Sequence, residues 1–288
     1  MLSFRRLPTL AVAGLALAVA VPASVLTAAH AADGPARTAP TSAGVDSAMS
    51  KALDALPASD GRYTVAVEDL HGRGSAVYGE ETGAFDTASV VKVDILAALL
   101  LDAQDRGEPL TAQQKKLAAA MIRSSDNDAT NALWKAIGGT DGLNAANNRL
   151  GLKDTRTDKD GHWGLTRTTA ADQMVLLEAV LGDAHSPLTA PSRGYLRSLM
   201  STVEANQRWG ISAAADSKRP GAAPALKNGW LPRSETELWD INSIGRVEYG
   251  GHTLLVAVLS DGQPSYKKGV DLVERAATTA VKAFVKAE

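Results

Sequence analysis

A serine and a lysine three residues apart stand at the start of a long apolar segment. Ser89 and Lys92 lie in the sequence Ser-Val-Val-Lys, and residues 87–104 are almost all apolar, which predicts a buried helix. Residues i and i+3 share a helix face, so the Lys92 amine is expected to reach the Ser89 hydroxyl. Burial lowers the pKa of a lysine, and a neutral Lys92 can take the proton of Ser89. This pair predicts a nucleophilic serine with a lysine as its base.

A second hydroxyl group follows in the sequence Ser125-Asp126-Asn127. This triplet comes directly after a predicted helix over residues 111–122 and is therefore expected on a loop. The Ser125 hydroxyl can relay a proton to a leaving nitrogen, and the Asn127 amide can bind a substrate amide or hold Lys92 in place. In isolation the same triplet is a common helix-capping turn.

A third motif, Lys227-Asn228-Gly229, is predicted at the start of a strand, where helical patterns give way to alternating ones. Lys227 would supply positive charge for a substrate carboxylate, and Gly229 would let a substrate backbone lie against the strand. The alternative is an Asn-Gly hairpin turn.

Each motif is weak alone, since a further Ser-x-x-Lys at residues 265–268 has no downstream partners and is predicted to be a solvated turn or a helix start.

The order of the three motifs resembles that of the class A β-lactamases and penicillin-binding proteins, which carry Ser-x-x-Lys, Ser-Asp-Asn and Lys-Thr-Gly. The resemblance extends over nearly everything after residue 60. It implies an acyl-Ser89 intermediate, with the backbone N–H groups of Ser89 and Trp230 as the oxyanion hole. Asn228 stands where the family usually has a hydroxyl side chain. The residues expected to bind substrate are Asn127, Lys227, Asn228, Gly229 and Trp230.

The main departure from class A lies between residues 150 and 169. Class A enzymes carry an omega loop here, with an essential glutamate that activates the deacylating water, and this segment contains no glutamate. Asp160 is the closest acid and is predicted to take the catalytic role, with His162 as the other candidate base. An aspartate is one methylene shorter, and a misplacement of about an ångström can cost on the order of a hundredfold in rate.

The predicted elements around these motifs are strands near both ends of the chain, with helices between them. Strands are predicted over 63–70, 75–78, 238–247 and 254–259, and helices over 111–122, 130–137, 141–149, 169–181, 191–203 and about 270–286. This order predicts an α+β fold of the β-lactamase-like type, in which an antiparallel five-stranded sheet is flanked by helices and joined by an all-helical lobe. The resemblance places the site at the junction of the two.

Three functions stay open on these residues. The first is a secreted serine hydrolase of the class A β-lactamase-like type that cleaves β-lactam or related amide bonds. The second is a D,D-peptidase-like or other amide or ester hydrolase that penicillins acylate but that deacylates slowly. The third is a non-catalytic module that binds or senses peptidoglycan or β-lactams. We expect a small-molecule β-lactam or a cell-wall peptide as the substrate, and a monomer.

The beginning of the chain predicts export. Arg5 and Arg6 precede an apolar stretch over 10–26, and Ala-His-Ala at 29–31 is a small-x-small cleavage site, which predicts a secretory signal peptide over 1–31. The protein is therefore expected to be secreted or extracytoplasmic, without a stable membrane anchor after cleavage behind Ala31. A retained anchor is the alternative, because the apolar stretch approaches spanning length. Residues 32–60 are expected to form a linker and a helix, and 61–288 the hydrolase domain, with the helical lobe over about 93–222.

Composition excludes several other functions. The chain has 30 basic and 32 acidic residues, a formal net charge of −2, which argues against nucleic acid as a partner. It contains no cysteine, and its five histidines show no metal-binding spacing, so we expect no metal site. Glycine-rich nucleotide-binding motifs are also missing from the sequence, and we expect no cofactor.

Overall fold

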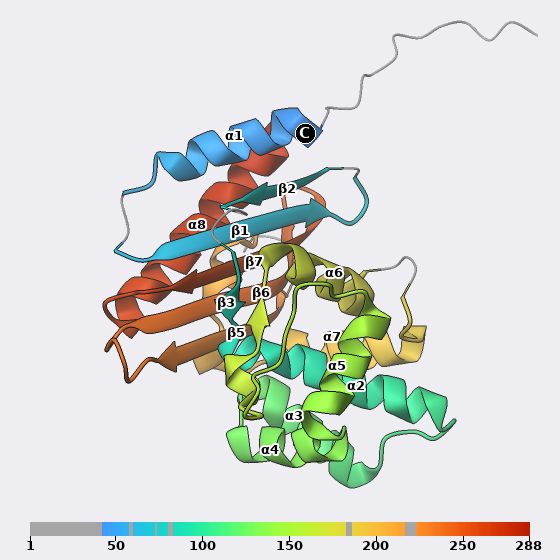
Figure 1. The fold of residues 1–288 in the computed structure, drawn as a ribbon. Coiled ribbons are helices and arrows are strands. Elements are labelled where there is room, and N and C mark those ends of the chain that lie inside the picture. The colour runs from blue at the N-terminus through green and yellow to red at the C-terminus, as the bar shows by residue number, and fades with distance from the viewer. Residues whose placement is uncertain (1–41, 58–59, 73, 80–82, 183–185, 217–222) are drawn as a thin grey trace, which may run out of the picture. The chain divides into compact units, whose positions relative to one another are not determined.

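A five-stranded antiparallel sheet forms the centre of the fold. The computed structural model describes residues 42–288 except 58–59, 73, 80–82, 183–185 and 217–222 (Figure 1). The sheet has the strand order β2-β1-β7-β6-β5. Its strands are β1 (Arg62–Asp69), β2 (Ser75–Tyr78), β5 (Ala225–Pro232), β6 (Trp239–Tyr249) and β7 (His252–Asp261). The predicted signal peptide lies outside the described residues.

Both faces of the sheet are apolar, because successive side chains of the central strands point to opposite sides. Val65 and Val67 of β1 face one hydrophobic cluster, whereas Ala66 between them belongs to the other. The first cluster is closed by α1 (Ser42–Asp54) and α8 (Tyr266–Ala287), which pack together against that face (Figure 1). Burying both faces makes the sheet a rigid support for the site.

Helices cover the opposite face and form the helical lobe. Helix α6 (Ala170–Leu181) contacts β1 and β7, and α2 (Lys92–Asp105) is buried along most of its length. The remaining helices are α3 (Ala112–Arg123), α4 (Asn127–Ala136), α5 (Gly139–Leu150) and α7 (Ala190–Ser201). A short pair of strands, β3 (Phe85–Asp86) and β4 (Arg167–Thr168), joins the segment before α2 to the segment before α6. The predicted α+β fold is confirmed.

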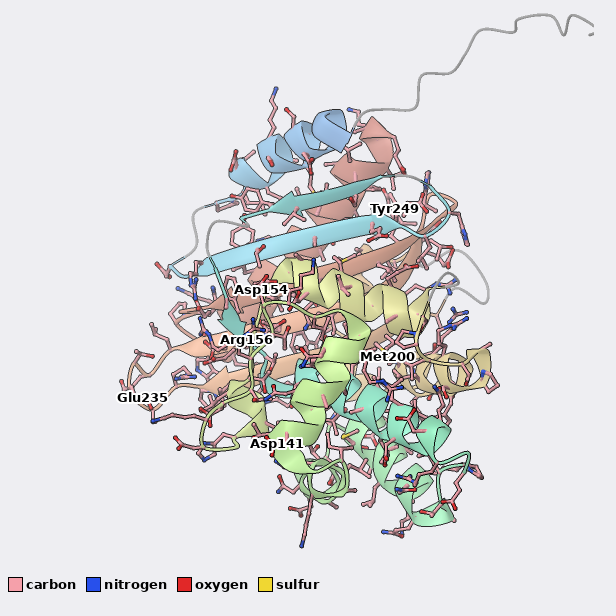
Figure 2. The ribbon with its side chains drawn as sticks, turned by 45° about the vertical axis from the view of Figure 1, so that its right-hand side comes forward. Asp141, Asp154, Arg156, Met200, Glu235 and Tyr249 are labelled. Atoms are coloured by element: carbon pink, nitrogen blue, oxygen red, sulfur yellow. The ribbon has the colours of Figure 1, made fainter. Side chains whose placement is uncertain are left out.

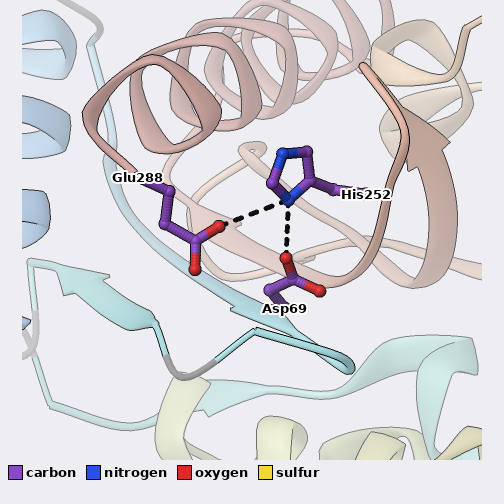
Figure 3. A group of neighbouring side chains, drawn as sticks. All are labelled: Asp69, His252 and Glu288. Atoms are coloured by element: carbon purple, nitrogen blue, oxygen red, sulfur yellow. Dashed lines mark hydrogen bonds and ion pairs between the residues drawn. The ribbon is translucent and has the colours of Figure 1, made fainter. Parts of the chain in front are cut away.

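Three polar side chains tie the end of α8 to the sheet (Figure 3). The Nδ1 atom of His252 lies 2.6 Å from an Asp69 carboxylate oxygen and 3.4 Å from a Glu288 carboxylate oxygen. Asp69 ends β1 and His252 begins β7, so the group joins two neighbouring strands and the segment that follows α8.

In the part of the chain that is described, none of the helices is both long and apolar enough to span a membrane.

Candidate active site

Ser89 lies on a tight turn in front of a helix. Residues Ala88–Val91 form a 3-10 helix (η2), and α2 begins only at Lys92, so the predicted α-helix over 87–104 is wrong in its first turn. Ala88 has a φ of 47°, a left-handed backbone conformation that is costly for a residue with a Cβ atom. The Asn242 amide anchors the turn by donating to the carbonyl oxygens of Asp86 and Thr87, at 2.8 and 3.1 Å. A strained turn held by its neighbours thus presents Ser89.

Lys92 is completely buried and points at the second motif. Its Nζ atom donates to the carbonyl oxygen of Ser125 at 2.7 Å, to Ser125 Oγ at 3.1 Å and to Asn127 Oδ1 at 2.8 Å. It also lies 4.9 Å from the centroid of the Trp163 ring. Burial lowers the pKa of Lys92 to about 8, with the Asp126 carboxylate acting in the opposite direction. Lys92 therefore loses its proton at a much lower pH than an exposed lysine does, and the neutral amine can accept a proton.

Ser125 sits on the connection between α3 and α4, as the sequence predicts, in an unusual backbone conformation. Its φ is 58°, in the left-handed region. Asp126 caps α4 by accepting a hydrogen bond from the Ala129 backbone N–H at 2.6 Å, and this cap fixes the connection. Ser125 Oγ also accepts a hydrogen bond from Lys227 Nζ at 3.0 Å. One hydroxyl group is therefore held by the Nζ atoms of two lysines.

Lys227 and Gly229 lie on the face of β5 that meets the Ser89 turn. Lys227 is 1% exposed, and burial together with the charge of Lys92 places its pKa well below the usual range. A Cβ atom on Gly229 would lie 2.8 Å from both the Ser89 nitrogen and the Thr87 carbonyl oxygen, so only glycine lets β5 approach this closely. The backbone of β5 at Gly229 therefore lies directly beside the Ser89 N–H.

Asn228 points away from these groups, contrary to the expectation that its side chain binds substrate. It alternates with Lys227 and Gly229 along β5 and is 1% exposed. Its Nδ2 atom donates to the carbonyl oxygens of Gln207 at 2.8 Å and Trp209 at 3.1 Å. Strand alternation therefore gives Asn228 a structural position that anchors the neighbouring segment.

A cavity of about 520 Å³ opens over Ser89. One wall is the loop that contains His162, Trp163, Gly164 and Leu165. The opposite wall is the end of β5 and the hairpin that follows it, with Glu235 on that hairpin (Figure 2). The lining residues are Ala88, Ser89, Ser125, Asn127, His162, Trp163, Gly164, Leu165, Trp230, Leu231, Pro232, Arg233, Ser234 and Glu235.

Asp160 is not among these lining residues, so the structure does not bring the predicted deacylating acid to the cavity. Its side chain is 62% exposed, and its backbone N–H donates to Asp158 Oδ2 at 3.0 Å within a turn. His162 follows in the same turn and does line the cavity, with its Nδ1 atom 3.0 Å from Asp158 Oδ2. His162 therefore lines the edge of the cavity with 68% of its side chain exposed, and Asp160 does not line it.

The hairpin wall was not predicted from the sequence. Lys227, Gly229, Leu231 and Arg233 alternate along one face of an extended chain, and this alternation is the signal that could have placed Arg233 at the site. The Arg233 guanidinium pairs with Asp86, the residue that ends β3. This ion pair joins the hairpin wall to the segment that leads into the Ser89 turn.

Comparisons with known proteins agree with this geometry. The sequence model described as the Beta-lactamase enzyme family matches residues 104–284, beginning downstream of Ser89. The protein named "Putative lipoprotein LppW", from Mycobacterium tuberculosis and from Mycobacterium bovis, is 30% identical over 139 residues, which are 48% of this chain and 44% of the relative. The chain thus spans less than half the length of the curated relatives it matches.

Solved structures share the fold. The TLA-1 extended-spectrum β-lactamase has a TM-score of 0.72 at 17% identity, and a class A β-lactamase from Bacteroides cellulosilyticus has 0.71 at 16%. Each alignment covers 84% of this chain and 99% of the other. PBP-A has a TM-score of 0.67 at 20% identity, covering 84% of this chain and 96% of that one. At these identities the likeness is one of fold.

Proposed function

Because this chain belongs to the Beta-lactamase enzyme family, we propose that it is a serine hydrolase that forms an acyl-Ser89 intermediate and releases the acyl group slowly. The substrate is an amide, either a β-lactam or a cell-wall peptide. The observation that carries the proposal is an indole ring on the wall where a class A enzyme has its glutamate. The Trp163 ring lies there, 4.9 Å from Lys92 Nζ.

Acylation draws on groups that are all present. Neutral Lys92 takes the Ser89 proton, and Ser89 Oγ then attacks the carbonyl carbon. The Ser89 and Trp230 backbone N–H groups stabilise the oxyanion. Ser125, which lies within hydrogen-bond distance of both lysines, passes a proton to the leaving nitrogen. The close approach of Gly229 to the Ser89 nitrogen supports this oxyanion hole.

Deacylation lacks a matching base. The loop wall supplies an imidazole, an indole, a glycine and a leucine, and none of these is a carboxylate. The one lining carboxylate, Glu235, belongs to the opposite wall. Water at the acyl carbonyl would therefore be weakly activated, which favours the slow-release alternative over efficient β-lactam hydrolysis.

A second candidate function, turnover of β-lactams, rests on the pair formed by His162 and Asp158. Asp158 is hydrogen-bonded to the backbone and ring of His162, and these bonds outweigh desolvation to lower the pKa of its carboxyl. A carboxylate that orients an imidazole at the edge of a cavity is the arrangement of a general base. In this case His162 would activate the deacylating water.

The location we propose is extracytoplasmic, with the protein as a monomer that has no stable membrane anchor. The name of the curated relative describes a lipoprotein, and cell-wall peptides and β-lactams meet a protein outside the cytoplasm. The expected signal peptide over residues 1–31 is in accord with this location.

Intact mass measured against time after addition of benzylpenicillin tests both functions. A lasting adduct of the drug's full mass, absent from Ser89→Ala, is the expected result. A short-lived adduct with complete consumption of the drug would favour turnover, and slower release in His162→Ala would assign the base. An adduct that persists in Ser89→Ala would refute the acyl-Ser89 intermediate.

A further inference from the structure

Aromatic side chains gather beside the active-site cavity. Three of the five tryptophans of the chain and one tyrosine form what we call the aromatic cluster: Trp209, Trp230, Trp239 and Tyr266. The Tyr266 ring meets the three tryptophans edge-on, at centroid distances of 6.0 Å to Trp209, 6.2 Å to Trp230 and 5.8 Å to Trp239. Such contacts hold the rings in fixed orientations.

A second cavity, of about 540 Å³, opens over this cluster. It is lined by Asn206, Gln207, Trp230, Trp239 and Tyr266. Tyr266 is 36% exposed, one of two large hydrophobic side chains with this much exposure among the described residues. Trp230 lines both cavities.

The polar groups of this cavity are amides. Gln207 is 7% exposed, and its Oε1 atom has no hydrogen-bond partner within the described part of the protein. Asn206 is exposed at the other side of the lining. None of the five lining residues is charged at neutral pH, since burial raises the pKa of the Tyr266 phenol further above its usual range.

This combination selects a class of ligand. The lining offers no charged side chain to an anion or a cation, and its exposed Asn206 amide can bind a ligand that carries hydrogen-bonding groups. A pyranose ring fits both features, because its C–H face can lie on the electron-rich face of an aromatic ring while its hydroxyl or acetamido groups bond to amides.

We propose that the cavity over the aromatic cluster is a saccharide subsite. Its occupant is a sugar or a short glycan, and the binding of this ligand by the cavity does not depend on the acylation of Ser89.

Calorimetric titration with tetra-N-acetylchitotetraose tests the subsite. We expect the wild-type chain to bind this oligosaccharide and Tyr266→Ala and Asn206→Ala to bind it about tenfold more weakly, the loss expected for one aromatic or amide contact. Tyr249→Ala is the matched control, because Tyr249 ends the strand that Trp239 begins (Figure 2). This variant should bind like the wild type.

Benzylpenicillin carries no sugar, so its rate of acylation should be the same in all four proteins and reports that each is folded. Absence of chitotetraose binding by a wild-type chain that benzylpenicillin acylates would overturn the subsite and leave the proposed function standing. Sugar binding by a wild-type chain that benzylpenicillin does not acylate would overturn the proposed function and leave the subsite standing. Equal affinity in the wild type, Tyr266→Ala and Asn206→Ala would also overturn the subsite.

Discussion

The Nζ atom of Lys227 lies 3.0 Å from the hydroxyl oxygen of Ser125, although 102 residues separate the two along the chain. Lys92 donates to the same oxygen at 3.1 Å, so Ser125 links the third motif to the first. The hydroxyl is in a position to receive a proton from one buried amine and pass it on. The first two predictions depend on this arrangement.

Replacing Ser125 by alanine should slow acylation by benzylpenicillin about a hundredfold, the lower end of the range for loss of a proton-transfer group. The neighbouring variant Ser124→Ala is the control, because the Ser124 hydroxyl donates instead to the exposed Glu204 carboxylate. The measurement is the rate of adduct formation by quenched-flow mass spectrometry. Equal rates in the two variants would remove Ser125 from the mechanism.

The acylation rate should rise with pH through about 8, the value to which burial lowers the pKa of Lys92. Only the neutral amine accepts a proton, and its fraction grows as pH rises through the pKa. Initial rates between pH 6 and 10 would give the profile, with Lys92→Met expected to lose most of the rate at every pH. A profile that is flat over this range would exclude Lys92 as the base.

Gly229→Ala should abolish acylation while the protein remains folded. The added Cβ would lie 2.8 Å from the Ser89 nitrogen, so β5 must move away from the oxyanion hole. Gly194→Ala is the control, because a Cβ atom there has nothing within 4 Å. Circular dichroism and the adduct assay would be run on both variants, and normal acylation of Gly229→Ala would contradict the proposed oxyanion hole.

A carboxylate on the loop wall should shorten the life of the acyl-enzyme. Gly164 lines the cavity, and a Cβ atom at this position would lie no closer than 4.0 Å to its nearest neighbour, Ala88 Cα. We expect Gly164→Glu to release benzylpenicilloate about tenfold faster than the wild type, less than an optimally placed base provides. Gly164→Gln, whose side chain has the same shape but no charge, should release it no faster than the wild type. Decay of the adduct mass after removal of free drug measures the effect, and equal decay in both variants would refute it.

Asp94 should make the protein less stable as pH rises. Its carboxyl group is fully buried, both oxygens have no hydrogen-bond partner within the described residues, and burial, aided by the charge of Asp172, raises its pKa to about 8. The folded state therefore keeps a proton that the unfolded state releases above its ordinary pKa near 4. The stabilising contribution is complete below about pH 4 and is lost as pH rises through about 8.

Asp94→Asn should remove this dependence. Relative to the variant, the wild type should lose up to about 1.4 kcal/mol of unfolding free energy per pH unit between about pH 4 and 8. Asp102→Asn, on the same helix with a side chain that is 44% exposed, is the control and should keep the wild-type slope. Urea unfolding at several pH values measures these slopes, and parallel curves for all three proteins would show that Asp94 is ionised in the folded state.

The elements with strong local patterns were predictable from the sequence. The helices after α2 and the strands of the sheet follow from periodicity, and the Thr111 capping box appears at the start of α3 as a Thr–Gln pair. The clustering of Lys92, Ser125 and Lys227 was expected only because the order of the motifs resembles a known family. Nothing local brings residues so distant in sequence together.

The expectations that the structure does not match concern features that are determined by contacts between residues far apart in the sequence. The direction of Asn228 depends on which face of β5 meets the Ser89 turn, and a shift of one residue would reverse it. Asp160 was chosen as the nearest acid in the sequence, but His162, whose Nδ1 atom lies 3.0 Å from Asp158 Oδ2, lines the cavity instead. The 3-10 turn at Ser89 depends on anchoring by Asn242, which lies far away in the sequence.

The burial of two amines around one hydroxyl also means that the site lowers the stability of the fold while it makes Lys92 reactive. Desolvation of Lys92 and Lys227 opposes folding, and the same desolvation makes Lys92 a usable base. Apolar replacements of similar length, such as Lys227→Met, would relieve that conflict. Directed evolution of this chain toward heat resistance alone would therefore drift toward well-folded proteins that have lost their chemistry, so any such campaign must select for acylation at every round.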